Sequence, residues 1–295
     1  MADKNRTCGA YAVILVGGKG KRLRPLSTDL RPKAFLSITR DGRTMFRKTF
    51  DRMMKLVPPE RILVVANTAH RRLVKRDLPA AAGRNALFEP VSRNTAPAIA
   101  IAALHLRRKG GDPVMMVVPT DQYVPDADKQ ARAMNKAVEF IEKHPDAIVT
   151  LGIRPKEPSA EFGYIKVGPA AGAIARVERF VEKPNRATAE RYVSDGGYLW
   201  NTGIFIFRVS TIIAAFKEHA KAIYGLMAAG DIMKRYADMP DISIDYAILE
   251  NADNIYCVKG SYSWSDVGNF EELKRVLKAE SMRFVEKDGR VVKIA

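Results

Sequence analysis

The strongest constraint on the fold is the junction at Val13 to Gly20, where an apolar segment meets a glycine-rich one. Val13 to Val16 are consecutive apolar residues, as expected of a buried strand. Gly17, Gly18 and Gly20 follow at once, so the strand should run directly into a loop that can adopt positive φ. Such a loop can bring its backbone N–H groups close to phosphate.

The same loop region is strongly cationic. Its positive side chains are Lys19, Lys21, Arg22, Arg24, Arg31 and Lys33. An amide-lined turn with this charge at a strand end suits a polyanion such as a nucleoside triphosphate. The string GGKGKRL is not a Walker A loop, because no Ser or Thr follows a Gly-Lys pair, and it does not fit GxGxxG either. A purely structural glycine turn explains a bare Gly-rich string about equally well.

The whole stretch from Val13 to Phe35 resembles the signature of sugar-1-phosphate nucleotidyltransferases, a Gly-Gly-x-Gly-x-Arg-Leu-x-Pro-Leu loop followed by Pro-Lys. The matching residues are Gly17, Gly18, Gly20, Arg22, Leu23, Pro25, Leu26, Pro32 and Lys33. The resemblance implies an α/β fold, with a Rossmann-like, mostly parallel mixed sheet flanked by helices, as in nucleotide-diphospho-sugar transferases. It also implies that Arg22 and Lys33 are catalytic and that Gly17, Gly18 and Gly20 bind the nucleotide.

Positive charge is concentrated in the first third of the chain. The formal net charge is +16, and residues 1–110 hold 24 Lys and Arg against 7 Asp and Glu. This distribution fits an electrostatic funnel for a triphosphate. A solvated basic face explains outlying clusters such as residues 71–76 and 107–109. No aromatic residues interleave those clusters as nucleic-acid stacking would require, so we expect no nucleic-acid partner.

The cysteines and apolar runs indicate the compartment. Cys8 and Cys257 are too few and too far apart in sequence for a disulfide framework or a zinc site, so a reducing cytoplasm fits. The longest apolar run near the N-terminus, Ala10 to Val16, is far shorter than the roughly 20 residues that a membrane span needs. We therefore expect a cytoplasmic protein without a membrane partner.

The periodicity after the loop indicates a β-loop-α-β-α order. Helical spacing covers Met45 to Val57, a strand covers Arg61 to Ala66, and a short helix covers about Ala69 to Asp77. This alternation predicts parallel strands joined by right-handed crossovers. Ligands bind beyond the carboxyl ends of such strands, which is where the glycine-rich loop lies.

Residues 88–100, FEPVSRNTAPAIA, predict a loop and then a helix, with Asn94 or Thr95 as its N-cap. The string also resembles the stretch that marks the mannose-1-phosphate guanylyltransferase branch of the family. That resemblance implies that Glu89, Asn94 and Thr95 bind the nucleotide. Guanine offers N1–H and N2–H₂ donors, which suit the side-chain oxygens of Glu89 and Asn94. The alternative is a good N-cap with no further role.

Two carboxylates, Asp121 and Asp266, are candidates to hold Mg²⁺. Asp121 follows the apolar strand Val114 to Val118, and Mg²⁺ is typically held by one or two carboxylates together with substrate phosphates. By residue type alone Asp121 reads more simply as a turn former. The family resemblance assigns the metal to both carboxylates. The family usually shows Pro-Ala-Asp-His or similar at the first one, whereas Thr120 and Gln122 flank Asp121 here.

The second half of the chain is richer in strands and resembles the sugar side of the family. The strings that carry this resemblance are GIRPKEPSAEFGYI, VERFVEKP, YLWNTGIFIF and SIDYA. They imply sugar-phosphate contacts by Gly163, Glu182, Lys183, Asn201 and Asp245, with Ser243 capping a helix. Without the resemblance, Glu182 and Lys183 read as a solvated strand end, and Asn201 as an amide that braces a turn.

We expect a nucleotidyltransferase domain over residues 8–280, with a nucleotide half of about 8–150 and a sugar-phosphate half of about 151–280. Residues 281–295 should form a short hairpin around Asp288 and Gly289, with no full C-terminal domain. The implied reaction is transfer of GMP from GTP to mannose-1-phosphate, with Mg²⁺ as cofactor. Alternatives are another member such as a glucose-1-phosphate thymidylyltransferase, or a non-catalytic paralogue that senses sugar nucleotides. The oligomeric state stays open, with a homodimer as the candidate.

Overall fold

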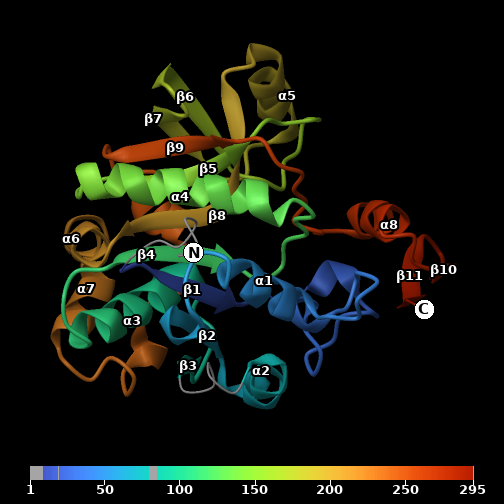
Figure 1. Cartoon of the computed structure of the whole chain (residues 1–295), viewed down its shortest axis with the longest axis horizontal. Helices are drawn as coiled ribbons and strands as arrows, with labels where there is room; N and C mark the ends of the chain where they lie inside the picture. Colours follow the sequence, from blue (N-terminus) through green and yellow to red (C-terminus); the bar gives the residue numbers. More distant parts are fainter. Residues whose placement is uncertain (1–8, 19, 80–84, 295) are drawn as a thin grey trace, which may run out of the picture.

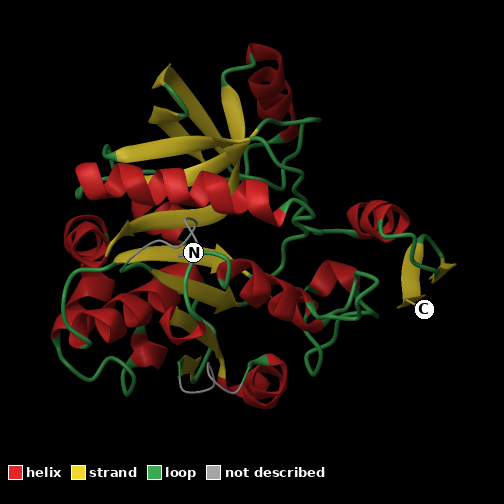
Figure 2. Ribbon diagram, viewed as in Figure 1, coloured by secondary structure: helices red, strands yellow, loops and turns green. Residues whose placement is uncertain are grey.

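The computed structural model of the protein describes residues 9–18, 20–79 and 85–294. Its centre is a nine-stranded mixed sheet with helices on both faces (Figure 1, Figure 2). This arrangement confirms the predicted α/β class. The strands of this sheet are β1 (Tyr11–Val16), β2 (Ile62–Asn67), β3 (Ala86–Glu89), β4 (Val114–Pro119), β5 (Ile148–Ile153), β6 (Tyr164–Ala171), β7 (Ile174–Val181), β8 (Tyr198–Arg208) and β9 (Ile255–Gly260).

The strand order is β3-β2-β1-β4-β8-β5-β9-β7-β6. From β3 to β4 all neighbouring strands are parallel, as the β-α-β-α pattern predicts. Strand β1 packs on both faces, with Ile14 in the core cluster of one face and Val13 in that of the other. Burial on both faces explains why β1 reads as a continuous apolar run.

Strand β8 joins the two halves of the sheet. It pairs antiparallel with both β4 and β5, and β5 in turn pairs in parallel with β9. Strand β7 pairs antiparallel with β9, and β6 pairs antiparallel both with β7 and with β8. The sheet therefore continues without interruption from the parallel part into the strand-rich second part.

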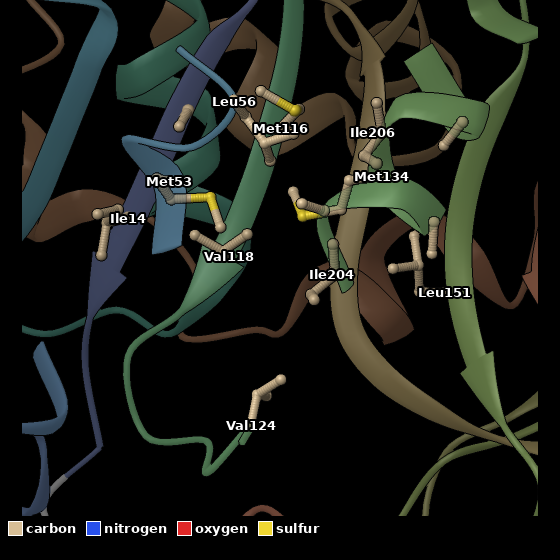
Figure 3. Close-up of a cluster of buried hydrophobic side chains, with 14 of the residues drawn as sticks. Ile14, Met53, Leu56, Met116, Val118, Val124, Met134, Leu151, Ile204 and Ile206 are labelled. Atoms are coloured by element: carbon tan, nitrogen blue, oxygen red, sulfur yellow. The ribbon is translucent and has the colours of Figure 1, made fainter. Parts of the chain in front are cut away.

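The helices cover the sheet in two layers. One face packs against α1 (Met45–Met53), α2 (Arg71–Asp77), α4 (Ala127–Lys143) and α5 (Arg186–Asp195). Figure 3 shows side chains of this core, in which Met53 and Met134 lie near Ile14, Val118 and Ile204. The other face packs against α3 (Thr95–Arg108), α6 (Val209–His219) and α7 (Lys221–Ala228).

Three predicted helix boundaries differ from the structure. Helix α1 ends at Met53, whereas the prediction extended it to Val57. Val57 directly precedes Pro58, and a residue before proline is disfavoured in an α conformation. Helix α2 begins at Arg71, because Thr68–His70 form a separate 3₁₀ turn. The helix expected after Ser243 is a short π-helical turn, Asp245–Leu249.

The C-terminal segment forms a small module beside the main body (Figure 1). It contains α8 (Phe270–Ala279) and the predicted hairpin, β10 (Phe284–Lys287) and β11 (Arg290–Ile294). A third hydrophobic cluster packs Leu273 and Val291 of this module against Leu23 and Leu36 of the N-terminal loop region.

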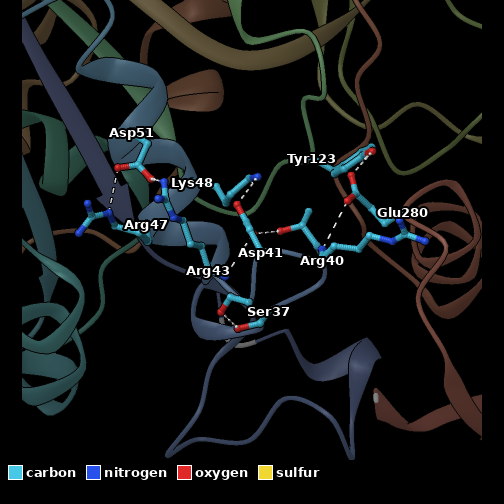
Figure 4. Close-up of polar contacts among 11 residues, drawn as sticks. Ser37, Arg40, Asp41, Arg43, Arg47, Lys48, Asp51, Tyr123 and Glu280 are labelled. Atoms are coloured by element: carbon cyan, nitrogen blue, oxygen red, sulfur yellow. Dashed lines mark hydrogen bonds and ion pairs between the residues drawn. The ribbon is translucent and has the colours of Figure 1, made fainter.

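Polar contacts reinforce this packing: Tyr123 donates to Glu280 at 2.8 Å, and the Arg40 backbone lies beside the same carboxylate (Figure 4). The module is thus held next to the segment that follows β4. In the described parts of the chain, no helix is long and apolar enough to cross a membrane.

Candidate active site

The glycine-rich loop folds back tightly onto Lys33. Gly20 has φ +59°, and a Cβ at this position would lie 2.8 Å from Cβ of Lys33. The hydroxyl of Ser27 donates to the Gly20 carbonyl at 2.6 Å and fixes the turn. A glycine is therefore required at position 20, because only its hydrogen fits against Lys33.

Lys33 contacts both residues that carry the predicted metal carboxylates. Its side chain is 6% exposed, and Nζ lies 3.1 Å from Oδ2 of Asp121. The same Nζ donates to the backbone carbonyl of Asp266. Two long-range backbone bonds hold the carboxylate-bearing segments together: Tyr123 N–H donates to Ser265 at 2.8 Å, and Ser265 N–H donates back at 3.1 Å.

The charges of this cluster influence one another. Burial raises the pKa of Asp266 above its usual value, and the Asp121 carboxylate raises it further, while Lys33 and Arg22 lower it. Arg22 itself is ion-paired with Glu161, which lies in the loop before β6. The structure thus brings together Arg22, Lys33, Asp121 and Asp266, residues that are far apart in the sequence.

The donor set fits a hard divalent cation. Two carboxylates lie beside one lysine, and Mg²⁺ usually takes one or two protein carboxylates and completes its coordination with phosphate and water oxygens. Among the described residues, no group of three or more His, Cys, Asp or Glu side chains forms a protein-only cage. Asp121 and Asp266 are thus suited to a metal that a substrate helps to hold.

The residues that flank Asp121 make structural hydrogen bonds. Thr120 donates to the carbonyl of Leu15 at 3.2 Å, which ties the end of β4 to β1. Gln122 is buried, and its amide donates to the carbonyl of Thr202. The departures from the family string therefore support the backbone around Asp121.

A cavity of about 570 Å³ lies beside the glycine-rich loop, and we call it the base-side cavity after the prediction for its residues. Gly17, Gly18, Glu89, Asn94 and Thr95 line it, as the nucleotide assignment requires, whereas Gly20 does not. Asn94 is the N-cap of α3, with φ +64° and its Oδ1 accepting from Thr95 N–H at 2.9 Å.

Glu89 is buried and accepts a hydrogen bond from the hydroxyl of Tyr236. Burial raises the pKa of Glu89, and the bond from Tyr236 opposes that shift. Neither Tyr236 nor Glu161 was identified from the sequence. Tyr236 stands in a segment without a motif. Glu161 lies within the family string GIRPKEPSAEFGYI, which assigned a role to Gly163 alone. The partner of each lies more than a hundred residues away.

The five residues predicted to contact the sugar phosphate also lie close together, and we call them the sugar-side cluster: Gly163, Glu182, Lys183, Asn201 and Asp245. A Cβ on Gly163 would lie 2.5 Å from Oε2 of Glu182 and 3.4 Å from Cβ of Asn201, so only glycine allows these side chains to approach. Asn201 donates to Asp245 at 3.1 Å, and Lys183 is ion-paired with Glu182. Burial, and then the charge of Glu182, raise the pKa of Asp245 to about 7.

The base-side cavity and the sugar-side cluster are directly connected. Oγ1 of Thr95 accepts a hydrogen bond from Ile244 N–H at 2.9 Å, and Ala96 N–H donates to the Ile242 carbonyl at 3.2 Å. Asp245 is the next residue along that segment. The start of α3 therefore holds the backbone from which Asp245 reaches the sugar side.

The remaining loop cations have different surroundings. Arg24 is ion-paired with Asp29 at 3.0 Å, Arg31 donates through Nε to the Phe35 carbonyl at 3.5 Å, and Lys21 is exposed. Lys19 and Cys8 lie outside the described residues. Among the loop cations that the structure describes, Arg22 and Lys33 are thus the ones that meet the carboxylate pair.

Known proteins resemble this chain over most of its length. The profile of the nucleotidyl transferase family matches residues 11–281. Xanthan biosynthesis protein XanB of Xanthomonas campestris pv. campestris is 38% identical over 275 residues, which cover 88% of this chain and 58% of XanB. The mannose-1-phosphate guanylyltransferase of Salmonella muenchen is 37% identical over 291 residues, which cover 92% of this chain and 60% of that enzyme. The chain thus spans about three fifths of the length of these curated relatives.

A solved structure gives the same result for the fold. The crystal structure described as a mannose-1-phosphate geranyltransferase from Thermus thermophilus superposes with a TM-score of 0.83 at 38% identity, covering 91% of this chain and 79% of that one. The family profile spans every element that carries the carboxylate pair, the base-side cavity and the sugar-side cluster. The chain belongs to the nucleotidyl transferase family.

Proposed function

We propose that this chain transfers GMP from GTP to mannose-1-phosphate, producing GDP-mannose and pyrophosphate. The observation that carries the proposal is the position of Lys33 against both Asp121 and Asp266, beyond the carboxyl ends of the central strands. Relatives that include a mannose-1-phosphate guanylyltransferase support the choice of base and sugar.

The chemistry is an in-line displacement at phosphorus. A phosphate oxygen of mannose-1-phosphate forms a bond to the α-phosphorus of GTP, and the bond from that phosphorus to the bridging oxygen breaks as pyrophosphate leaves. The attacking oxygen is already anionic at neutral pH, so no side chain has to remove a proton from it. Positioning and charge neutralisation therefore carry the rate.

Each cation has a separate task in this proposal. Arg22 stabilises the charge that develops on the leaving pyrophosphate. Lys33 steadies the α-phosphate, and Lys183 aligns the phosphate of the incoming sugar. A substrate phosphate near Arg22 competes with Glu161 for its guanidinium, since both are anions that an arginine binds through its N–H groups.

Asp121 and Asp266 would hold Mg²⁺. When bound, the ion supplies positive charge that neutralises the phosphate oxygens of both substrates. The two aspartates also keep Lys33 oriented, because one accepts from its Nζ through a side-chain oxygen and the other through its backbone carbonyl. The assignment of Mg²⁺ rests on this donor set.

The two substrates occupy different parts of the chain. The nucleotide half, about residues 8–150, binds GTP, with Glu89, Asn94 and Thr95 next to guanine in the cavity beside the loop. The sugar-phosphate half, about residues 151–280, binds mannose-1-phosphate through Gly163, Glu182, Asn201 and Asp245. Carboxylate and amide oxygens suit both tasks, because guanine and sugar hydroxyls offer donors.

Pyrophosphate release tests the proposal directly. The assay combines GTP, ATP, dTTP or UTP with mannose-1-phosphate or glucose-1-phosphate in the presence of Mg²⁺. We expect release with GTP and mannose-1-phosphate alone. Pyrophosphate release with another pair would support the same displacement reaction but overturn the assigned base and sugar. If no pair released pyrophosphate although the chain still bound nucleotide, the non-catalytic sensing paralogue would be favoured.

A further inference from the structure

A cavity with four arginines in its wall lies beside the segment that leads to Lys33. Its volume is about 430 Å³. We call it the arginine pocket after Arg31, Arg43, Arg47 and Arg76, which line it. These side chains come from the loop before Lys33, from the beginning of α1 and from the end of α2. The fold thus gathers in one place cations that are spread along the sequence.

Two carboxylates hold three of these arginines in place. Asp51 accepts from Nη1 of Arg43 at 2.6 Å and from Nε of Arg47 at 2.9 Å (Figure 4). Asp77 accepts from Nε of Arg76 at 2.7 Å. The side chains of Asp51 and Asp77 are only 19% and 10% exposed, so the carboxylates lie mostly beneath the surface. The guanidinium groups are therefore anchored from the protein side.

The arginine donors are accessible and largely unused. The side chains of Arg43 and Arg76 are 53% and 57% exposed, and that of Arg47 is 32% exposed. Arg31 is exposed and has no ion-pair partner in the part of the chain that the structure describes. A guanidinium has five N–H donors, and hydrogen bonds to described residues use one or two of them on each arginine. Most of these donors are thus left for a ligand.

The charges of the pocket do not balance. Four guanidinium groups face two carboxylates, which leaves an excess of two positive charges. A cleft with charges of one sign focuses the electric field and concentrates counter-ions. Thr44, the N-cap of α1, also lines the pocket, so the positive end of that helix dipole adds to the field. The pocket is therefore suited to an anion with two negative charges.

We infer that the arginine pocket binds a phosphate dianion, either free or as the end group of a small phosphate ester. A phosphate monoester carries close to two negative charges at neutral pH, which matches the excess charge of the pocket. Its oxygens point in tetrahedral directions, so they can accept from arginines that approach from different elements. The volume lies within the ~300–1,000 Å³ of small-molecule pockets, which leaves room for a group attached to the phosphate.

The arginine pocket is separate from the proposed active site. Lys33, Asp121 and Asp266 do not line it. Of the residues that do line it, Phe35 alone also lines the base-side cavity. Arg31 lies two residues before Lys33, so a bound phosphate would contact the segment that carries Lys33 without entering the active site.

Isothermal titration calorimetry with inorganic phosphate tests the inference without Mg²⁺ and without nucleotide. At about pH 8 phosphate is mainly a dianion, and constant ionic strength keeps non-specific screening the same throughout. We expect saturable binding of inorganic phosphate to the full chain. The absence of saturable binding would overturn the inference.

Four variants locate the bound phosphate. Arg43→Gln and Arg76→Gln each remove one charge from an exposed side chain and should weaken phosphate binding about tenfold. Arg186→Gln, an exposed arginine paired with Glu190 on α5, is the matched control. Arg22→Gln removes a cation of the proposed active site and should leave the binding unchanged. Unchanged binding in both pocket variants would overturn the inference, and loss of binding in Arg22→Gln alone would place the phosphate in the active site.

Two further ligands identify the chemistry of the anion. Malonate also carries two negative charges, but on planar carboxylates, so it should bind more weakly than phosphate, and equal affinity would overturn the assignment to phosphate. Glucose-6-phosphate carries the dianion on a sugar and should compete with inorganic phosphate. If it binds more tightly than inorganic phosphate, the ligand is a phosphate ester, and if it binds more weakly, the ligand is the free anion. Because nucleotide is absent, none of these results depends on the pyrophosphate assay.

Discussion

Arg22 of the glycine-rich loop is ion-paired through Nη1 with Glu161, which lies 139 positions further along the chain. Both side chains are partly exposed, at 56% and 36%. The partner of Arg22 in this structure is therefore a carboxylate that an incoming triphosphate would have to displace.

Glu161→Gln should lower the KM for GTP about two- to fivefold. The substitution removes the charge that competes for Arg22, and a partly exposed ion pair contributes only modestly to binding or stability. Steady-state kinetics at saturating mannose-1-phosphate measures the change. Glu190→Gln, which removes a carboxylate from the surface pair with Arg186, is the matched control and should leave the KM unchanged. An unchanged or higher KM in Glu161→Gln would show that Glu161 does not compete with the nucleotide.

Asp121→Asn should raise the Mg²⁺ concentration needed for half-maximal rate and lower kcat about a hundredfold. The variant loses one candidate metal ligand and leaves Lys33, which is almost fully buried, without its carboxylate partner. The measurement is a Mg²⁺ titration of pyrophosphate release. Asp126→Asn, in the same connecting segment and paired with Lys129, should behave like the unmodified chain. Wild-type Mg²⁺ dependence in Asp121→Asn would rule out this residue as a metal ligand.

The sequence indicated where these carboxylates lie because their positions depend on local features. Asp121 follows an apolar run that is typical of a buried strand, and the family resemblance assigns the second carboxylate to Asp266. The order of the strands depends on contacts that no local pattern contains, and β8 between β4 and β5 is the clearest case. Hydrogen bonds such as that from Tyr236 to Glu89 are missed for the same reason, since a lone tyrosine in a polar segment gives no indication of what it will contact.

Glu182→Ala should raise the KM for mannose-1-phosphate tenfold or more and change the KM for GTP little. Glu182 lies against Gly163 and beside Lys183 in the sugar-side cluster, and a hydrogen bond to a charged group contributes about 1.5–3 kcal/mol. Glu178→Ala, an exposed carboxylate of the same strand β7, is the control. Equal losses for both substrates would contradict the division between nucleotide and sugar halves.

Asp245→Asn should raise the melting temperature at pH 8 and have little effect near pH 4. An unfolded aspartate ionises near pH 4, whereas burial and the nearby Glu182 raise the pKa of folded Asp245 to about 7. The folded state therefore binds the extra proton between these values, and stability falls as the pH rises through that window.

Asparagine cannot ionise, and its side-chain oxygen can still accept from Asn201. Calorimetry of both proteins from pH 4 to pH 8 measures the difference, which should grow with pH and level off above about pH 7, the folded pKa of Asp245. A difference that does not depend on pH would show that Asp245 is ionised throughout.

Thr95→Val should raise the KM for mannose-1-phosphate about three- to tenfold, although Thr95 lines the base-side cavity. Oγ1 of Thr95 accepts from Ile244 N–H at 2.9 Å and so holds the backbone next to Asp245. Valine has nearly the same shape but leaves that N–H without its acceptor, so the segment can shift away from the sugar. Thr95→Ser retains the oxygen and should restore the KM. A rise in the KM for GTP alone would show that the hydrogen bond between Ile244 and Thr95 does not affect the binding of mannose-1-phosphate.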